Sequence, residues 1–291
     1  MTGMGKTMWP TWGLVIAMAI WGGSFIALKI AFRAYDPMVV MWGRMGGSCL
    51  LFLPMLNRVT RIHYRSGDWK YFLLMGIFEP CLYFTFEAHA LTYTSASQAG
   101  IITAMLPVLV AVAAWGVLGE TFSMKSLLGF ILAVTGACVL SVSGGETAAS
   151  PNPALGNFLE FLAMVWATCY AVLLKQLSHR YPALFLTFVQ TITGLVYFSL
   201  LLLFPGTVFP QHIDTPGIGA IVFLGSVVTF GAYFLYNYGV SRMPAGRATA
   251  FVSLIPVFAV IMGWLFLDER LTYVQFLSTC LILTGVYYSQ A

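Results

Sequence analysis

The sequence contains very little charge. Asp, Glu, Lys and Arg make up 8% of its 291 residues, whereas a soluble domain carries roughly 25%. Hydrophobic residues make up 59% of the chain. This balance excludes an ordinary soluble protein and predicts an all-α integral membrane protein. The formal net charge of +4 comes from basic residues spread among short loops, so it does not indicate nucleic-acid binding.

The sequence also lacks the usual motifs of metal, redox and nucleotide chemistry. Its five cysteines show no CxxC pair and no Cys/His ligand spacing, so we interpret them as small buried residues. No GxxxxGK[ST] loop is present, which argues against ATP as an energy source. No paired histidines, acid pair with metal spacing or Ser/Lys arrangement points to an enzyme. We expect no cofactor and no metal.

Long apolar runs, by contrast, are plentiful. A helix needs about 20 residues to cross a bilayer, and ten apolar segments approach this length. They lie at about 10–32, 38–56, 69–91, 95–118, 123–143, 155–177, 182–204, 216–240, 245–267 and 272–290. The first is too long for a signal-peptide core, so we interpret it as a retained span. The short connections leave no room for a separate soluble domain.

One stretch occurs twice. Residues 96–120 (ASQAGIITAMLPVLVAVAAWGVLGE) align without a gap with residues 245–269 (AGRATAFVSLIPVFAVIMGWLFLDE), and the numbers of matched residues differ by 149. Matches include Pro107/Pro256, Trp115/Trp264, Glu120/Glu269 and, further on, Gly136/Gly285. Earlier matches, such as Trp21/Trp166 and Pro37/Pro182, differ by 145. The chain is therefore predicted to contain two five-helix repeats, 1–146 and 152–291, joined by a linker rich in Gly, Ser and Pro.

The basic residues predict how the chain lies in the membrane, because cytoplasmic loops collect Lys and Arg. With the N-terminus inside, the inner side receives Lys6, Arg58, Arg61, Arg65, Lys70, Lys125, Lys175, Arg180, Arg242 and Arg247, and the outer side only Lys29, Arg33 and Arg270. Both termini are therefore expected in the cytoplasm. Because five spans per half is an odd number, the two repeats would have inverted topology.

Several stretches resemble a known family. They are AIWGGSF at 19–25, LTYTSASQA at 91–99 leading into Pro107, and the span ends LGE at 118–120 and LDE at 267–269. The whole chain is similar to the drug/metabolite transporter superfamily, specifically its EamA-type members with ten helices. The resemblance implies a substrate cavity between the halves, lined by the first, third and fourth spans and their counterparts, the sixth, eighth and ninth. It also implies substrates that range from amino acids and amines to drugs and other metabolites.

The third span carries two carboxyl groups. Glu79, Tyr83 and Glu87 lie at helical spacing (i, i+4, i+8), so they share one face. A carboxylate at mid-bilayer costs about 2.5–3.5 kcal/mol, so this face should point into the bundle, where it could exchange a proton or bind a cationic amine. Glu87 could instead form a structural ion pair with Arg44, whereas for Glu79 we favour a cavity role. His89 is either a proton relay or an interfacial polar residue.

The second half has no acids at the matching positions. Val228 and Tyr236 stand where the first half has Glu79 and Glu87. We therefore expect an asymmetric cavity with its charge on one wall.

Deep aromatic residues could complete such a site. We single out Trp21, Trp166, Tyr233, Tyr236 and Asn237. With an acid nearby, aromatic rings can hold a cationic amine by cation–π contacts. Core packing is the alternative use of these residues.

Three prolines, Pro80, Pro107 and Pro256, fall near the middles of their spans. Each removes a backbone donor and frees the carbonyl four residues earlier, at Gly76, Thr103 and Val252 respectively. Freed carbonyls can line a cavity, and a plain packing kink is the alternative. For the repeated pair Pro107 and Pro256 we expect a gating bend.

The repeated acids Glu120 and Glu269 are interpreted as structural. They precede Ser123 and Thr272, which are expected to be the N-caps of the next helices. An acid at that place suits the helix dipole.

Taken together, these features predict a secondary active transporter of a bacterial-type inner membrane. It would export or exchange a small organic metabolite, such as an amino acid or amine, by alternating access, with a proton as a candidate coupling ion. A passive facilitator or channel on the same fold is the alternative, and a membrane-embedded enzyme is disfavoured. Its expected partners are the substrate and the lipid bilayer, and the chain is a monomer or homodimer.

Overall fold

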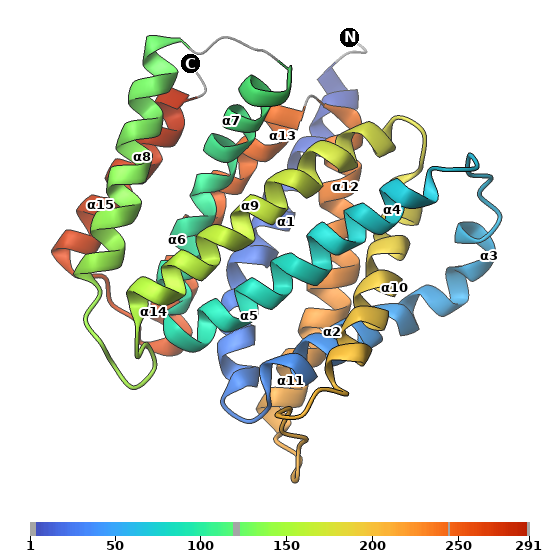
Figure 1. Ribbon diagram of the computed structural model, residues 1–291, viewed down its shortest axis with the longest axis horizontal. Coiled ribbons are helices and arrows are strands. Elements are labelled where there is room, and N and C mark those ends of the chain that lie inside the picture. The colour runs from blue at the N-terminus through green and yellow to red at the C-terminus, as the bar shows by residue number, and fades with distance from the viewer. Residues whose placement is uncertain (1–3, 119–122, 244, 290–291) are drawn as a thin grey trace.

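The computed structural model describes residues 4–118, 123–243 and 245–289 (Figure 1). Within these ranges the chain forms helices and loops, with one isolated bridge between Thr147 and Ser150 and no strand. Eight described helical segments are long and apolar enough to cross a bilayer: Trp9–Phe32, Pro37–Val59, Ala96–Ala113, Met124–Ser143, Pro153–Ser178, Ala183–Leu201, Thr215–Arg242 and Arg247–Leu267. The other two predicted spans are also helical, at 69–93 with an interruption and at Tyr273–Ser289.

Three helices of the first half begin at a recognisable cap. Its elements are α1 (Met4–Phe32), α2 (Pro37–Phe52), η1 (Leu53–Met55), α3 (Leu56–Val59), α4 (Trp69–Gly76), η2 (Ile77–Leu82), α5 (Tyr83–Tyr93), α6 (Ala96–Ile102), η3 (Thr103–Met105), α7 (Leu106–Leu118) and α8 (Met124–Ser143). Side chains of Asp36, Ser95 and Ser123 accept backbone N–H groups in the first turns of α2, α6 and α8. These caps satisfy N–H groups that have no partner within the helix.

The second half follows the same plan. Its elements are α9 (Pro153–Ser178), α10 (Ala183–Leu201), α11 (Thr215–Phe223), η4 (Leu224–Ala232), α12 (Tyr233–Arg242), α13 (Ala245–Ala250), η5 (Phe251–Leu254), α14 (Ile255–Leu267) and α15 (Tyr273–Ser289). Asn152 and Asp214 cap α9 and α11. Thr272 and Gln275 cap each other's backbone at the start of α15, so the predicted caps Ser123 and Thr272 are both present.

Helix interruptions recur at matched positions in the two halves. The 3₁₀ segments η3 and η5 directly precede the turns that contain Pro107 and Pro256, and the two segments pack against each other. Each half also contains a π-helical stretch, η2 in the first half and η4 in the second. The two stretches are at matched positions, because subtracting 149 from the residue numbers of η4 gives a range that includes η2. Such interruptions inside a helix often mark functional hinges.

Equivalent helices of the two halves pack antiparallel. In the pair α8/α15, which forms one edge of the molecule in Figure 1, Gly136 lies against Ser278 while Gly285 lies against Gly129 and Ala133. A Cβ at Gly136 would come within 2.9 Å of the Ser278 carbonyl oxygen, and one at Gly285 within 2.4 Å of the Ala133 nitrogen. These two contacts are equivalent under the repeat, because residue 136 of the first half matches residue 285 of the second and residue 129 matches residue 278. Small residues permit this close approach of backbones.

A carboxylate joins the halves at one end of the fourth and ninth segments. Glu269 accepts the backbone N–H groups of Ala96 (2.9 Å) and Ser97 (2.8 Å) at the start of α6. Thr272 caps α15 as expected, and the Glu269 carboxylate, which we expected to suit the dipole of α15, caps a helix of the other half instead. The structural role and the favourable position at a helix N-terminus remain. Its repeat counterpart, Glu120, lies outside the described residues.

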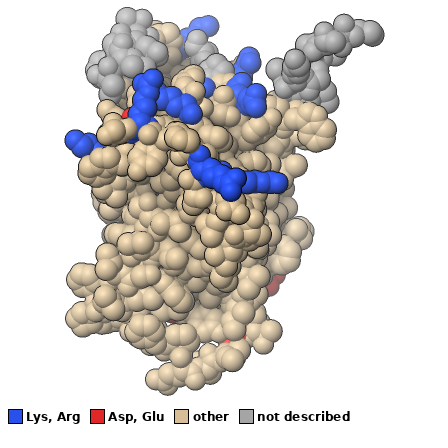
Figure 2. Space-filling model, turned by 90° about the vertical axis from the view of Figure 1, so that its right-hand side faces the viewer, with Lys and Arg blue, Asp and Glu red and all other residues tan. Residues whose placement is uncertain are grey.

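Basic side chains gather at one end of the molecule. On the face in Figure 2, Lys and Arg lie mainly at the end where both termini lie in Figure 1. Below these side chains, most of this face is without charge. A band of uncharged surface next to a basic end is typical of a protein that sits in a bilayer.

Candidate functional site

A cavity lies where the two halves meet. Its volume open to the centres of water molecules is about 40 Å³. It is lined by Trp21, Ser24, Phe25, Arg44, Glu79, Tyr83, Phe84, Glu87, Thr103, Leu106, Met164, Ala167, Tyr170, Tyr233, Tyr236, Val252 and Ile255. Four pairs of lining residues from the third and fourth spans and their counterparts are 149 apart: Phe84/Tyr233, Glu87/Tyr236, Thr103/Val252 and Leu106/Ile255. Lining residues come from the six spans that the family resemblance implied, with Arg44 of α2 in addition. The repeat pairs therefore place the cavity at the interface of the halves.

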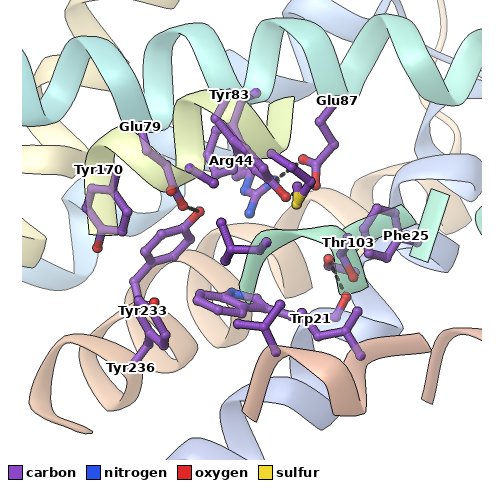
Figure 3. Close-up of a pocket in the computed structure, with 17 residues that line it drawn as sticks. Trp21, Phe25, Arg44, Glu79, Tyr83, Glu87, Thr103, Tyr170, Tyr233 and Tyr236 are labelled. Atoms are coloured by element: carbon purple, nitrogen blue, oxygen red, sulfur yellow. Dashed lines mark hydrogen bonds and ion pairs between the residues drawn. The ribbon is translucent and has the colours of Figure 1, made fainter. Parts of the chain in front are cut away.

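Glu79 reaches the cavity through a break in its span. Its backbone is extended (φ −149°, ψ 118°), and the following peptide bond to Pro80 is cis. The Glu79 side chain is buried, and its Oε1 accepts a hydrogen bond from the Tyr233 hydroxyl across the cavity wall (Figure 3). Gln190 Nε2 donates to the Glu79 carbonyl oxygen at 3.4 Å. Partners on α10 and α12 thus hold Glu79 in place.

Arg44 and Glu87 form an ion pair in the same wall. Arg44 Nη1 lies 3.5 Å from Glu87 Oε2, and both residues are at most 3% exposed. Arg44 Nε also donates to Thr229 Oγ1 at 2.8 Å, and its guanidinium lies 3.8 Å from the centre of the Phe84 ring. Glu87 Oε1 accepts from the Tyr83 hydroxyl at 2.8 Å. The ion pair and a position in the cavity wall, which we treated as alternatives for Glu87, occur together.

Aromatic side chains face this charged wall. In Figure 3, Trp21, Tyr233 and Tyr236 lie on the opposite side of the cavity from Arg44 and Glu87. The Trp21 ring centre lies 5.2 Å from that of Tyr233 and 4.9 Å from that of Tyr236. The buried Trp21 Nε1 has no hydrogen-bond partner in the described part of the chain. A buried N–H without a partner is costly, so this group is a candidate donor to a bound molecule.

Two predicted site residues do not line the cavity. Trp166 stacks on Phe78, with ring centres 5.9 Å apart. Asn237 is fully buried and accepts from the Tyr170 hydroxyl at 2.6 Å, while its Nδ2 lies 2.9 Å from both Thr187 Oγ1 and Gln190 Oε1. Asn237 therefore supports the cavity wall from behind, whereas Trp166 contacts a residue that does not line the cavity. Tyr170, which we did not predict, is the member of this network that lines the cavity.

His89 lies apart from this cluster. Its side chain is exposed and lines a separate surface pocket with Thr85 and Tyr197. Residues two apart on a helix point in nearly opposite directions, so His89 and Glu87 occupy different faces of α5. Among the described residues, no hydrogen bond or ion pair connects the His89 side chain to the cavity.

Glu160 of α9 is an acid that our sequence reasoning missed. It is fully buried, and neither carboxyl oxygen has a hydrogen-bond partner in the described residues. It lies near Glu87 and Tyr83 of α5. Glu160 belongs to the second half but does not line the cavity, whose charged lining residues are Arg44, Glu79 and Glu87 of the first half. The signal was available, since Glu160 falls inside the predicted span 155–177.

The cavity has the chemistry of a binding site for a small organic molecule. One wall offers carboxyl groups and a guanidinium, and the other offers ring faces and an unpaired indole N–H. Concave sites lined by apolar and aromatic side chains with a few convergent polar groups commonly bind metabolites. Within the described residues, no group of three or more His, Cys, Asp or Glu is arranged to hold a metal ion.

Comparison with known proteins agrees with this architecture. The model of the EamA-like transporter family matches residues 8–142 and 154–289. The uncharacterized transporter YcxC of Bacillus subtilis is 28% identical over 91% of this chain and 87% of its own. A probable terminal-alkyne amino-acid exporter of Streptantibioticus cattleyicolor is 22% identical over 89% of this chain and 85% of its own. One solved crystal structure shares the fold, with a TM-score of 0.66 at 18% identity over 96% of this chain and 95% of that one.

Proposed function

The chain belongs to the EamA-like transporter family, and from this premise we propose that it is a secondary active transporter that exports or exchanges a small organic metabolite by alternating access. The family and the names of similar proteins make it a multi-pass membrane transporter rather than an enzyme. Energy coupling, substrate class and topology are the parts of the proposal that go beyond the family.

The proposed topology is ten spans in two inverted repeats, 1–146 and 152–291, in the cell inner membrane with both termini in the cytoplasm. Antiparallel packing of α8 and α15 supports inversion, because equivalent segments of inverted repeats must run in opposite directions. Lys and Arg at the end of the molecule that holds both termini support the orientation.

The proposed substrate is an amine or an amino acid. Glu79 would bind the ammonium group, and Arg44 would be available to a carboxylate. Trp21, Tyr233 and Tyr236 would contact the ligand through their ring faces, and the Trp21 N–H would donate to it. The name of the similar amino-acid exporter agrees with this chemistry. Buried Glu79, set opposite these rings in the cavity between the halves, is the observation that carries the proposal.

The proposed gates are the matched breaks before Pro107 and Pro256. Segments η3 and η5 contact each other and contribute Thr103 and Val252 to the cavity lining. Bending at one break would open the cavity to one side of the membrane, and bending at its counterpart would open it to the other.

A thermal-shift screen tests the binding site. Purified protein is heated with amines, amino acids and organic anions, and the screen is repeated on Glu79→Gln and on the control Glu146→Gln, which changes an exposed loop acid. Amines or amino acids should raise Tm of the wild type and of the control by mass action, and Glu79→Gln should abolish the shift. Stabilisation by anions that is unchanged in Glu79→Gln would contradict the role of Glu79.

Counterflow in proteoliposomes then tests the transport mode. The probe is the compound that gives the largest thermal shift, in labelled form. Unlabelled compound on the far side should accelerate its exchange if the protein is a carrier. A passive pore would show no acceleration.

A further inference from the structure

Glu160 lies opposite Glu87, as the packing of their helices shows. At one end of the contact between α9 and α5, Gly156 packs against Thr94 and the Ala90 carbonyl oxygen. Towards the other end, Trp166 stacks on Phe78, just before α5 begins. The two helices therefore run antiparallel. Glu160, one turn after Gly156, comes level with Glu87.

Each of these facing carboxyl groups has at least one oxygen without a hydrogen-bond partner. Glu160 is 0% exposed and has no hydrogen-bond partner in the described residues, and Glu87 Oε2 has none beyond its 3.5 Å ion pair with Arg44. An ionised carboxylate without partners is among the costliest groups to bury. A protonated Glu160 would remove that cost and could donate its O–H to Glu87 Oε2.

The surroundings supply no other charge to neutralise Glu160. The titratable groups that face it are Glu87 and Tyr83 on α5. Among the other elements packed against this part of α9, the sequences of α6, η3 and α7 contain no titratable side chain, and the described ones of α8, Lys125 and Cys138, are exposed. Glu79 of η2 and Tyr236 of α12 face the far end of α9, near Tyr170.

The cluster has more carboxyl groups than positive charges. It contains three buried carboxyl groups, on Glu79, Glu87 and Glu160, and one guanidinium, on Arg44. Tyr233 donates to Glu79, and both Tyr83 and Arg44 stabilise an ionised Glu87. Among the described residues, no group stabilises an ionised Glu160 in this way.

We propose that Glu160 and Glu87 form a proton-binding site between α9 and α5, in which Glu160 carries an exchangeable proton. Release passes H⁺ from the Glu160 carboxyl group to water, giving a carboxylate and H₃O⁺, and no other bond changes. The carboxylates of Glu160 and Glu87 then face each other, so the Arg44–Glu87 contact in the cavity wall changes with the state of Glu160. As a coupling site, this inference rests on the proposed transport function.

Infrared spectroscopy of the full-length protein in lipid tests the site with the proton itself as probe. Spectra are recorded from about pH 5 to about pH 9, and the C=O band of buried carboxylic acids is followed. Part of this band should disappear as pH rises in the wild type and in the exposed-acid control Glu146→Gln. That part should be missing at every pH in Glu160→Gln, a near-isosteric mimic of the protonated acid. Glu79→Gln should retain it, which separates Glu160 from Glu79.

Two results would overturn the proposal. One is a pH-dependent band that is the same in the wild type and Glu160→Gln. The other is a Glu160 band that does not change with pH, since such a proton is not exchangeable.

If Glu160→Gln does not fold, the variant Glu87→Gln still tests the proposal. Removing the facing carboxylate should move the midpoint of the Glu160 band to lower pH, because one like charge is lost. An unchanged midpoint contradicts the pairing. No substrate is needed, so loss of counterflow with an intact titration would reject the transport proposal alone, and the reverse pattern would reject the proton site alone.

Discussion

The third and eighth segments, 69–93 and Thr215–Arg242, share a backbone plan and differ in chemistry. Both contain a π-helical stretch at matched positions and both contribute to the cavity. In η2, however, the stretch carries Glu79 in an extended conformation, whereas in η4 the matched residue is the buried Val228. The interruptions thus recur in both halves, while the side chains that they carry into the cavity differ between them.

The largest effect is expected for the charged residues of the first half, which have no counterpart in the second. Arg44→Leu should destabilise the fold by about 3–5 kcal/mol, because Glu87 is left buried without its partner. The double variant Arg44→Leu/Glu87→Leu should recover much of that loss, since it leaves no unpaired charge at this position. Thermal unfolding in one detergent compares the variants. Equal stability of the single variant and the wild type would show that the pair contributes nothing.

Substituting leucine at the two matched glycines tests the packing that the two halves share. Gly136→Leu and Gly285→Leu should each cost about 3 kcal/mol, because each added side chain meets backbone of the partner helix within 3 Å. Gly219→Leu is the control, since a Cβ there meets nothing within 4 Å. The fraction of monodisperse protein on size exclusion and its Tm are measured. We expect similar losses of Tm and of monodisperse protein at both matched positions and none at the control. Clearly different losses at positions 136 and 285 would show that the two contacts are not equivalent.

Removing one hydroxyl group sharpens the comparison inside the cavity. Tyr233→Phe makes the matched pair Phe84/Tyr233 identical and removes the donor to Glu79. Bonds to charged groups contribute about 1.5–3 kcal/mol, so ligand affinity should change about tenfold or more. Tyr236→Phe, which alters a neighbouring lining residue, is the matched control. Binding of the best ligand from the thermal-shift screen is the readout, and equal affinities in both variants would argue against the Glu79–Tyr233 unit.

The smallest effect is expected at the contact between Glu269 and the start of α6. Glu269→Ala removes the acceptor of two backbone N–H groups and should lower stability by about 1 kcal/mol, as loss of a helix cap does. Glu146→Ala, at an exposed loop acid, should have no measurable effect. Tm reports both, and a loss of several kcal/mol would mean that Glu269 does more than cap α6.

The internal repeat and the helical spacing of residues predicted those features of the fold that depend on local sequence. The repeat positioned the breaks before Pro107 and Pro256, and helical spacing brought Glu79, Tyr83 and Glu87 to one cavity. That outcome held although the helix is interrupted at Glu79, because η2 turns the side chain back towards the cavity.

What failed depends on how whole helices rotate and pair. Trp21 and Trp166 match in the sequence, but only Trp21 lines the cavity, since α9 turns Trp166 towards Phe78. Glu269 caps a helix that lies far away in the chain, and Glu160 faces Glu87 through the contact between α5 and α9. Spacing within one segment contains no information about such partners.

The central claim is that the two halves lie antiparallel across the membrane around the cavity. Lys125 and Val274, 149 residues apart, are exposed second residues of α8 and α15. Single cysteines at these positions, in a chain whose five native cysteines are replaced, are labelled with a membrane-impermeant thiol reagent on intact cells and on inverted vesicles. The account predicts that position 274 reacts from outside and position 125 from the cytoplasmic side. Reaction of both from the same side would contradict it.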